Sequence, residues 1–235
     1  MCERYKSLVK QKLKFGERHF TQLTEAGVRD LVRRVNVRLG YTNTTLSYRA
    51  VDLMWDMCRF ELSFFYNSNR SSSALYPWCA VFSDQDMKLL EENEDLYYYY
   101  KDGYPYNITL NMTSVLLHDL IKTVKKRGSN KFYFAHSETL IPLLARLGVA
   151  RDDPPLSLDN MPDDRLWRTS LIGGESANIV VLGYNCDNQT KLSFFLNERL
   201  VGIEGCESGH LCDASDFVEN FEKYSLESLG DMCDE

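Results

Sequence analysis

The sequence has no long hydrophobic run and no excess of positive charge. None of its apolar stretches approaches the roughly 18 consecutive residues of a transmembrane helix, so we expect no membrane-spanning segment. The formal net charge of −7 argues against a general nucleic-acid-binding protein, although a local basic pocket could still bind a small anion. The first 20 residues are charged and lack the apolar core that a signal peptide requires.

Histidine is scarce as well, with 4 residues in the whole chain. No His-Glu-x-x-His sequence is present, and His136 and Glu138 by themselves do not provide the three protein ligands of a catalytic zinc site. A zinc hydrolase is therefore the weakest of the enzyme hypotheses. We expect neither a metal nor an organic cofactor.

The chain is long enough to bury a sizeable core and is rich in aromatic residues. Its 235 residues include 14 Tyr, 12 Phe and 3 Trp. This length fits one large domain or two small ones.

Two features of the sequence point to the secretory pathway. The first is a set of five N-glycosylation sequons, at Asn43, Asn69, Asn107, Asn111 and Asn188. The second is a set of seven cysteines, an odd number that leaves at least one thiol without a partner inside the chain. We expect N-glycans and a location in the endoplasmic reticulum lumen, outside the cell or at the plasma membrane. A signal peptide would then belong to a beginning of the protein that this sequence lacks.

One disulfide can be predicted from spacing. Cys58 and Cys79 flank a single short loop that carries a sequon, so we expect them to be bridged. The pairing of Cys2 and of the three C-terminal cysteines stays open.

Hydrophobic periodicity predicts a mostly helical first half of the chain. Apolar residues recur at helical spacing in four stretches, residues 24–39, 48–65, 84–100 and 111–126. Ser83 and Asp86 have the spacing of a capping box at the start of the third stretch, with Asp in place of the usual Glu. Residues 101–106 favour a turn.

Strand signals are confined to the second half. Residues 179–184 and 192–196 are strand-like and, with the Asn-rich turn between them, predict a hairpin. Residues 132–135, FYFA, predict a buried strand. The Pro- and Asp-rich segment 151–170 is long for a loop in a compact domain, which makes it a candidate functional loop. A short helix is expected at 217–224.

His136 and Glu138 stand where the predicted strand gives way to a helix that Ser137 could cap. Free N–H groups and the helix dipole favour an anion at such a point. A histidine and a carboxylic acid two residues apart could then bind a phosphate and protonate its leaving oxygen. The plain alternative is a capped helix with one half-buried histidine.

Several segments also match a known family in their order along the chain. Residues 135–144, AHSETLIPLL, correspond to the family sequence GHAETLLPLL. Further matches are residues 76–82 (YPWCAVF, for SPWCxVF), 100–104 (YKDGY, for the [WY]KxGY turn), 167–172 (WRTSLI) and 196–198 (LNE). The sequence therefore resembles the multiple inositol polyphosphate phosphatases, in the histidine acid phosphatase branch of the histidine phosphatase superfamily.

The resemblance implies a fold and a mechanism. It implies an α/β fold, a histidine phosphatase-like sheet with flanking helices and a mostly helical cap region, here incomplete at the N-terminus. The cap would occupy residues 1–127, the C-terminal part of the catalytic domain residues 128–212 and an acidic tail residues 213–235. In the family, a neutral histidine of an Arg-His-Gly-x-Arg segment attacks phosphorus and forms a phosphohistidine, while arginines bind the phosphoryl oxygens.

The resemblance also assigns roles to residues of this chain. His136 would contact the phosphoryl group, and Glu138 would protonate the departing oxygen, a role that suits a carboxyl group whose pKa is raised by partial burial. Lys101, Tyr104 and Arg168 would help to bind the substrate.

One departure from the family bears on activity. No Arg-His-Gly-x-Arg sequence exists in the 235 residues, and Arg18-His19 is followed by Phe and Thr. We therefore expect a C-terminal partial chain that supplies the proton-donor half of a phosphatase site and is inactive alone. Its substrates would be inositol polyphosphates of the phytate type, with bisphosphoglycerates as a further option. The alternative hypothesis is a non-catalytic secreted glycoprotein that kept the fold without the nucleophile.

Overall fold

The computed structural model describes residues 2–10, 25–41, 45–65, 76–126, 130–206 and 211–233. The chain divides into two compact units. Unit 1 comprises Met1–Phe15 and Asp95–Glu235, and unit 2 comprises Gly16–Glu94. Both helices and an antiparallel sheet are present, which confirms the predicted mixed α and β architecture. The predicted division into three regions, at residues 127/128 and 212/213, stays a prediction.

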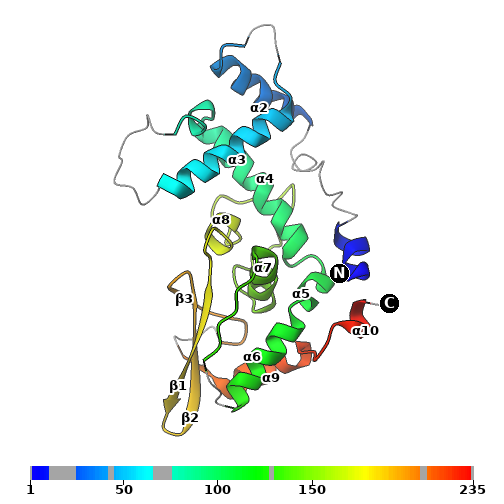
Figure 1. Cartoon of the computed structure of the whole chain (residues 1–235), viewed down its shortest axis with the longest axis vertical. Coiled ribbons are helices and arrows are strands. Elements are labelled where there is room, and N and C mark those ends of the chain that lie inside the picture. The colour runs from blue at the N-terminus through cyan, green and yellow to red at the C-terminus, as the bar shows by residue number, and fades with distance from the viewer. Residues whose placement is uncertain are drawn as a thin grey trace. The chain divides into compact units, whose positions relative to one another are not determined.

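Unit 2 is helical. Its elements are α2 (Glu25–Arg38), α3 (Tyr48–Phe65), the 3₁₀ helix η3 (Cys79–Val81) and the first part of α4 (Asp84–Asp102) (Figure 1). The ends of α3 coincide with the prediction, and those of α2 lie within one residue of it. The apolar faces of these helices meet in a small core whose members include Leu31, Val35, Val51, Phe82 and Leu90.

The predicted disulfide and the predicted capping box are both present in unit 2. Cys58 on α3 is bonded to Cys79 on η3. At the start of α4, the Ser83 N–H donates to Asp86 Oδ2 (3.0 Å), and the Asp86 N–H donates to Ser83 Oγ (3.2 Å). The Asp86 carboxylate also accepts from Arg34 and Arg38, each at 2.6 Å. Burial by itself would raise the pKa of Asp86, but these hydrogen bonds lower it to about 2.

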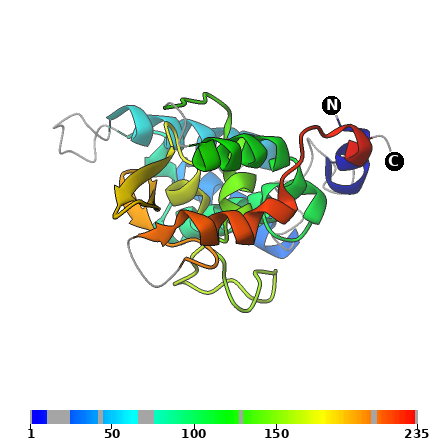
Figure 2. The same cartoon turned by 90° about the horizontal axis from the view of Figure 1, so that it is seen from below.

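Unit 1 joins a helical layer to a small sheet. Its helical elements are α1 (Glu3–Tyr5), the π-helix η1 (Lys6–Lys10), the end of α4, α5 (Asn107–Asn111), α6 (Ser114–Lys126), α7 (Ser137–Arg146), α8 (Thr169–Ile172), α9 (Ala214–Phe221), the 3₁₀ helix η4 (Glu222–Tyr224) and α10 (Gly230–Cys233). Helix α9 runs beside α6 (Figure 1), and α1 and α10 lie side by side at the right of Figure 2. The Cys2–Cys233 disulfide joins α1 to α10 near the chain ends, and Cys206 is bonded to Cys212.

The sheet confirms the predicted hairpin. Strands β1 (Ile179–Cys186) and β2 (Gln189–Leu196) pair antiparallel along their whole length, from Ile179 opposite Leu196 to Cys186 opposite Gln189. Asp187 and Asn188 form the turn with positive φ, which Asp and Asn tolerate better than most residues. The short strands β3 (Arg199–Val201) and β4 (Cys212–Asp213) pair with opposite ends of β2.

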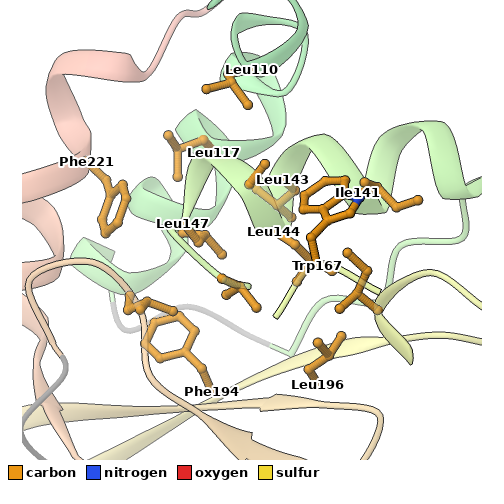
Figure 3. Packing of buried hydrophobic residues seen from close by; sticks show 14 of the residues in the cluster. Leu110, Leu117, Ile141, Leu143, Leu144, Leu147, Trp167, Phe194, Leu196 and Phe221 are labelled. Carbon is orange, nitrogen blue, oxygen red and sulfur yellow. The ribbon is translucent and has the colours of Figure 1, made fainter. Parts of the chain in front are cut away.

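The core of unit 1 lies between the sheet and helices α6, α7 and α9. Leu192, Phe194 and Leu196 alternate on the buried face of β2, as the two-residue period of a strand requires. Figure 3 shows Phe194 and Leu196 below Leu144, Leu147 and Trp167, with Phe221 of α9 at the side.

The predicted strand at residues 132–135 is wrong. Residues 130–136 have no regular secondary structure, and Phe132 and Phe134 are 82% and 95% exposed. A strand is stabilised by ladder hydrogen bonds to a neighbour, and no described residue pairs with this segment. The run is apolar, but its composition alone does not decide whether it is buried, because burial also requires a neighbouring strand or helix to cover it.

Two further local predictions need correction. Ser137 is the first residue of α7 and not its cap, because the cap position is held by His136. The single helix expected over residues 111–126 is divided into α5 and α6. Thr113 Oγ1 donates to the Leu110 carbonyl (2.8 Å) at the break, and the Leu117 N–H then donates to the Thr113 carbonyl (2.9 Å) to start α6.

Two predictions remain, a short helix in the C-terminal tail and the absence of a membrane-spanning segment. The helix expected at residues 217–224 is present as α9 and η4. None of the helices within the described ranges combines the length and the apolar character of a bilayer span.

Candidate active site

The candidate site is built on the first turn of α7. His136 is the N-cap residue, with extended backbone, and its side chain lies exposed to solvent. Glu138 follows in the first turn, where a negative charge is favoured by the helix dipole, and its side chain is 57% exposed. The rest of α7, from Ile141 onward, is buried, and Ile141 and Leu144 anchor it in the core. Pro142 lies inside the helix and has no N–H to donate to the Glu138 carbonyl.

A buried lysine from another helix reaches this turn. Lys101 lies in the last turn of α4, and its Nζ is 3.2 Å from Glu138 Oε1 and 3.5 Å from Asp102 Oδ2. The side chains of Lys101 and Asp102 are only 6% and 1% exposed. The Lys101 ammonium also lies 5.2 Å from the centre of the Tyr98 ring, which favours a cation there. One buried cation therefore contacts a buried carboxylate and an exposed one.

The end of α4 is held in place by a close contact with Trp167. Gly103 follows Asp102, and a Cβ atom on Gly103 would lie 2.5 Å from the Tyr99 carbonyl oxygen and 2.8 Å from a Trp167 ring carbon. Only glycine allows this approach. Trp167 is fully buried, packs edge-on against Tyr99 and donates its indole N–H to the Asp95 carbonyl (3.1 Å).

The ionic contacts set the protonation of the site. The Lys101 ammonium holds the pKa of Glu138 below its ordinary value. Burial by itself would lower the pKa of Lys101, but Asp102 and Glu138 raise it. The raised pKa expected of a proton donor is therefore not found for Glu138. Glu138 is mostly exposed, so desolvation is weak and the charge of Lys101 dominates.

The structure brings Lys101 and Glu138 into contact next to His136, and it gives the other two predicted residues different surroundings. The Tyr104 hydroxyl donates to the Val149 carbonyl (2.8 Å), and its ring packs on Trp167. Arg168 is the N-cap residue of α8, and its Nε is buried. Substrate binding by Tyr104 and Arg168 stays a prediction.

Asp102 is the residue that the sequence prediction missed, because the sequence predicts a turn at residues 101–106. A signal was present. Asp95, Tyr99 and Asp102 are spaced at i, i+4 and i+7, and all three are buried on one face of α4. Extending the helical period by one more turn would have placed Asp102 on the buried face.

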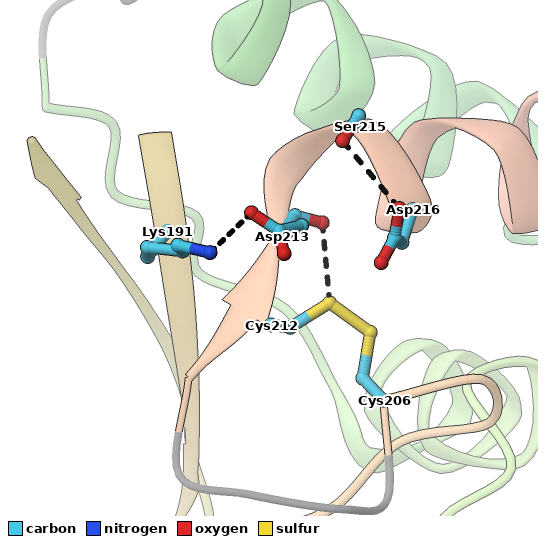
Figure 4. The surroundings of a disulfide bond; sticks show 6 residues. All are labelled: Lys191, Cys206, Cys212, Asp213, Ser215 and Asp216. Atoms are coloured by element: carbon cyan, nitrogen blue, oxygen red, sulfur yellow. Dashed lines mark hydrogen bonds and ion pairs between the residues drawn. A yellow bond between two sulfur atoms is a disulfide. The ribbon is translucent and has the colours of Figure 1, made fainter. Parts of the chain in front are cut away.

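A hollow of about 830 Å³ elsewhere in unit 1 does not suit a polyanion. It lies between the end of α6, the start of β2 and α9, and its charged lining residues are Lys125, Asp213, Asp216, Glu219 and Glu222. Two of these carboxylates already have partners. Asp213 pairs with Lys191 at 2.5 Å (Figure 4), and Glu222 pairs with Lys125. The excess of negative charge would repel a phosphate.

No metal centre is found within the described ranges. There, no three side chains of His, Cys, Asp or Glu come together as ion ligands.

Comparison with known proteins identifies the family. Residues 1–197 match the model of the histidine phosphatase superfamily, branch 2. The chain belongs to this branch of the histidine phosphatases. As a branch 2 histidine phosphatase, it carries His136 and Glu138 within the matched region.

Related sequences and a related structure agree with this assignment. The chain is 33% identical over 209 residues to multiple inositol polyphosphate phosphatase 1 of Drosophila melanogaster. This match covers 86% of this chain and 43% of that protein. It is 27% identical over 195 residues to the human protein of the same name, a match that covers 75% of this chain and 39% of the human protein. The crystal structure of a phytase from D. castellii superposes with a TM-score of 0.69 at 18% identity, over 87% of this chain and 46% of that one. The chain thus spans less than half the length of these relatives.

Proposed function

We propose that this chain supplies the leaving-group side of a phosphatase site that hydrolyses inositol polyphosphates. His136 contacts the phosphoryl group, and Glu138 protonates the oxygen that leaves phosphorus. The attacking histidine would come from an Arg-His-Gly-x-Arg segment, which the 235 residues do not contain. The names of the relatives, inositol polyphosphate phosphatase and phytase, support the substrate class.

One observation carries this proposal. Lys101 and Glu138 are 37 residues apart in the sequence, and both belong to segments that resemble the family, yet their side chains meet within hydrogen-bond distance beside His136. An exposed acid and an exposed histidine next to a buried ammonium group form a surface that suits a phosphate ester.

The decisive experiment compares the chain alone with a chimera. Residues 1–235 alone are expected to release no phosphate from inositol hexakisphosphate. A chimera is then made with the preceding half of the Drosophila relative, checked to carry Arg-His-Gly-x-Arg, fused before this chain. It should release phosphate, because the nucleophile and the proton donor are then present in one protein.

The controls separate the two hypotheses. Replacing the histidine of the added Arg-His-Gly-x-Arg segment by Ala should abolish the activity of the chimera. A chimera that folds, as judged by circular dichroism and a cooperative thermal transition, but stays inactive would favour the non-catalytic glycoprotein. Full activity of residues 1–235 alone would overturn the view that this chain holds half of a site.

We also propose that the protein passes through the secretory pathway and carries N-glycans. Three disulfides support an oxidising compartment. Asn107 and Asn188 are exposed, so the folded chain can accommodate a glycan on either residue. Asn111 is different, because its Oδ1 accepts a 2.6 Å hydrogen bond from Arg146 Nη2 within the fold. Asn43 and Asn69 lie outside the described residues.

Peptide mapping after secretion behind a leader peptide and release by a glycosidase tests this proposal. Asn107 and Asn188 are expected to be occupied. Asn111 should be occupied to a much smaller extent, because its side chain is half-buried and held by Arg146, which leaves less room for a glycan on its Nδ2. Unmodified Asn107 and Asn188 in secreted protein would contradict the glycan proposal. Predominant occupancy of Asn111 would contradict the structural argument.

A further inference from the structure

The two carboxylates that share Lys101 differ in whether they can leave it. Asp102 is 1% exposed and follows Lys101 directly in α4, so the helix and its burial keep it beside the ammonium group. Glu138 is 57% exposed, at the start of a different helix. Breaking a buried ion pair costs far more than breaking an exposed one. The contact between Lys101 and Glu138 is therefore the exchangeable one.

A phosphate group arriving at His136 would compete for this same contact. Lys101 carries three N–H donors, and a phosphate presents charged oxygens that accept hydrogen bonds strongly. Glu138 would then have lost its contact with the Lys101 ammonium and would lie next to the negatively charged phosphate. A carboxylate in that position takes up a proton from solvent, because the like charge of the phosphate disfavours its ionised form.

We propose that Lys101 is passed from Glu138 to a phosphate oxygen when substrate binds, and that this exchange releases Glu138 to hold a proton only in the occupied site. Asp102 anchors Lys101 in both states. This inference rests on the proposed function, and it names Lys101 as a phosphate contact and Asp102 as its positioning residue.

The other ionisable groups around the site are consistent with this exchange. Tyr97 and Tyr98 of α4 face Lys101, and Tyr5 of α1 lies beyond Asp102. Glu138 is also faced by His136. Burial raises the pKa of Tyr97 to about 12 and that of Tyr5 above its ordinary value, so both stay neutral at working pH. Lys101 is therefore the main cation that holds Glu138 ionised when no phosphate is bound.

The test is a titration of Glu138 in residues 1–235 by NMR of ¹³C-labelled glutamate carboxyl groups, with the signal assigned by its absence in Glu138→Gln. Without ligand, the pKa of Glu138 is expected below its ordinary value. Saturating inositol hexakisphosphate should raise it, whereas sodium chloride at the same ionic strength should not.

The matched variant is Lys101→Met with Asp102→Asn, which removes the cation and the buried anion together and so keeps the charge of the interior balanced. Without ligand, Glu138 should titrate at a higher pH in this variant than in the original chain. Binding of inositol hexakisphosphate, measured by calorimetry, should weaken about tenfold or more, the usual loss for one charge-assisted hydrogen bond. Lys125→Met, which removes an exposed lysine paired with Glu222, is the control and should change neither quantity.

The outcomes distinguish this inference from the proposed function. If inositol hexakisphosphate binds but leaves the titration of Glu138 unchanged, the exchange is wrong while the phosphate site stands. An unchanged Glu138 pKa in the ligand-free double variant also overturns it, since Lys101 would then not control Glu138. Absence of binding, together with an inactive chimera, overturns the proposed function itself.

Discussion

Glu138→Gln is expected to slow the hydrolysis of inositol hexakisphosphate by the chimeric enzyme about 10²- to 10⁴-fold, the usual contribution of a general acid. Glutamine keeps the shape of Glu138 and can still accept a hydrogen bond from Lys101, 3.2 Å from Oε1, but it has no acidic proton to give. The inositol oxygen would then have to leave as a poorly stabilised alkoxide. Steady-state rates of phosphate release measure the effect.

The choice of substrate makes this prediction specific. With nitrophenyl phosphate the leaving group needs no proton, so the loss in Glu138→Gln should become much smaller. His136→Ala should slow both substrates alike, because it removes a contact to the phosphoryl group that both share. The control is Glu227→Gln, an exposed glutamate outside the site, which should leave both rates unchanged. Equal losses on the two substrates in Glu138→Gln would contradict the proton-donor role.

Asp95→Ala is expected to lower the free energy of unfolding of unit 1 by about 3–5 kcal/mol, the cost of leaving a buried charge without its partner. Asp95 and Arg165 are each 1% exposed, and Asp95 Oδ2 accepts from Arg165 Nε at 2.9 Å and from Nη2 at 2.5 Å. Asp95 Oδ1 also accepts from the Thr169 N–H at 2.7 Å. The carboxylate therefore joins α4 to the loop that carries Trp167 and to the start of α8.

Urea unfolding of residues 1–235, followed by near-UV circular dichroism, measures this loss. Glu204→Ala is the matched control, because Glu204 and Arg151 form an ion pair with side chains 59% and 62% exposed, and such pairs contribute about 0–1 kcal/mol. Asp95→Asn keeps the shape and an acceptor for the Thr169 N–H, so it should fall between the two. A loss below about 1 kcal/mol in Asp95→Ala would show that Asp95 and Arg165 do not act as a buried pair.

Predictions based on local patterns succeeded where the structure is itself local. Helix α3 was predicted with both ends right, since its apolar period and its flanking polar residues lie within one stretch of sequence. The capping box of Ser83 and Asp86 was also predicted, because its hydrogen bonds span only three residues. The β1–β2 hairpin was predicted for the same reason, although its strands extend further into the polar turn than their composition suggested.

Predictions that depended on distant partners were less successful. Residues 132–135 have the composition of a buried strand, but their side chains are exposed because no described strand pairs with them. The turn predicted at residues 101–106 left Lys101 and Asp102 out of helix α4, which in the structure continues to Asp102 and ends where Gly103 packs against Trp167. The pKa of Glu138 was expected to be raised, and the nearby ammonium of Lys101 lowers it instead.

By itself, the sequence determined the helices α2, α3, α4 and α6 to within a few residues. It also determined that β1 and β2 form a hairpin and that His136 and Glu138 stand at the start of a helix, because each of these properties is decided within a few neighbouring residues. It also carried the family resemblance, since motifs are local. Only the tertiary structure decided that Lys101 meets Glu138 across 37 residues, with Asp102 buried behind it. The charges of a site act through space, and the distances between them are set by how the helices pack in the core.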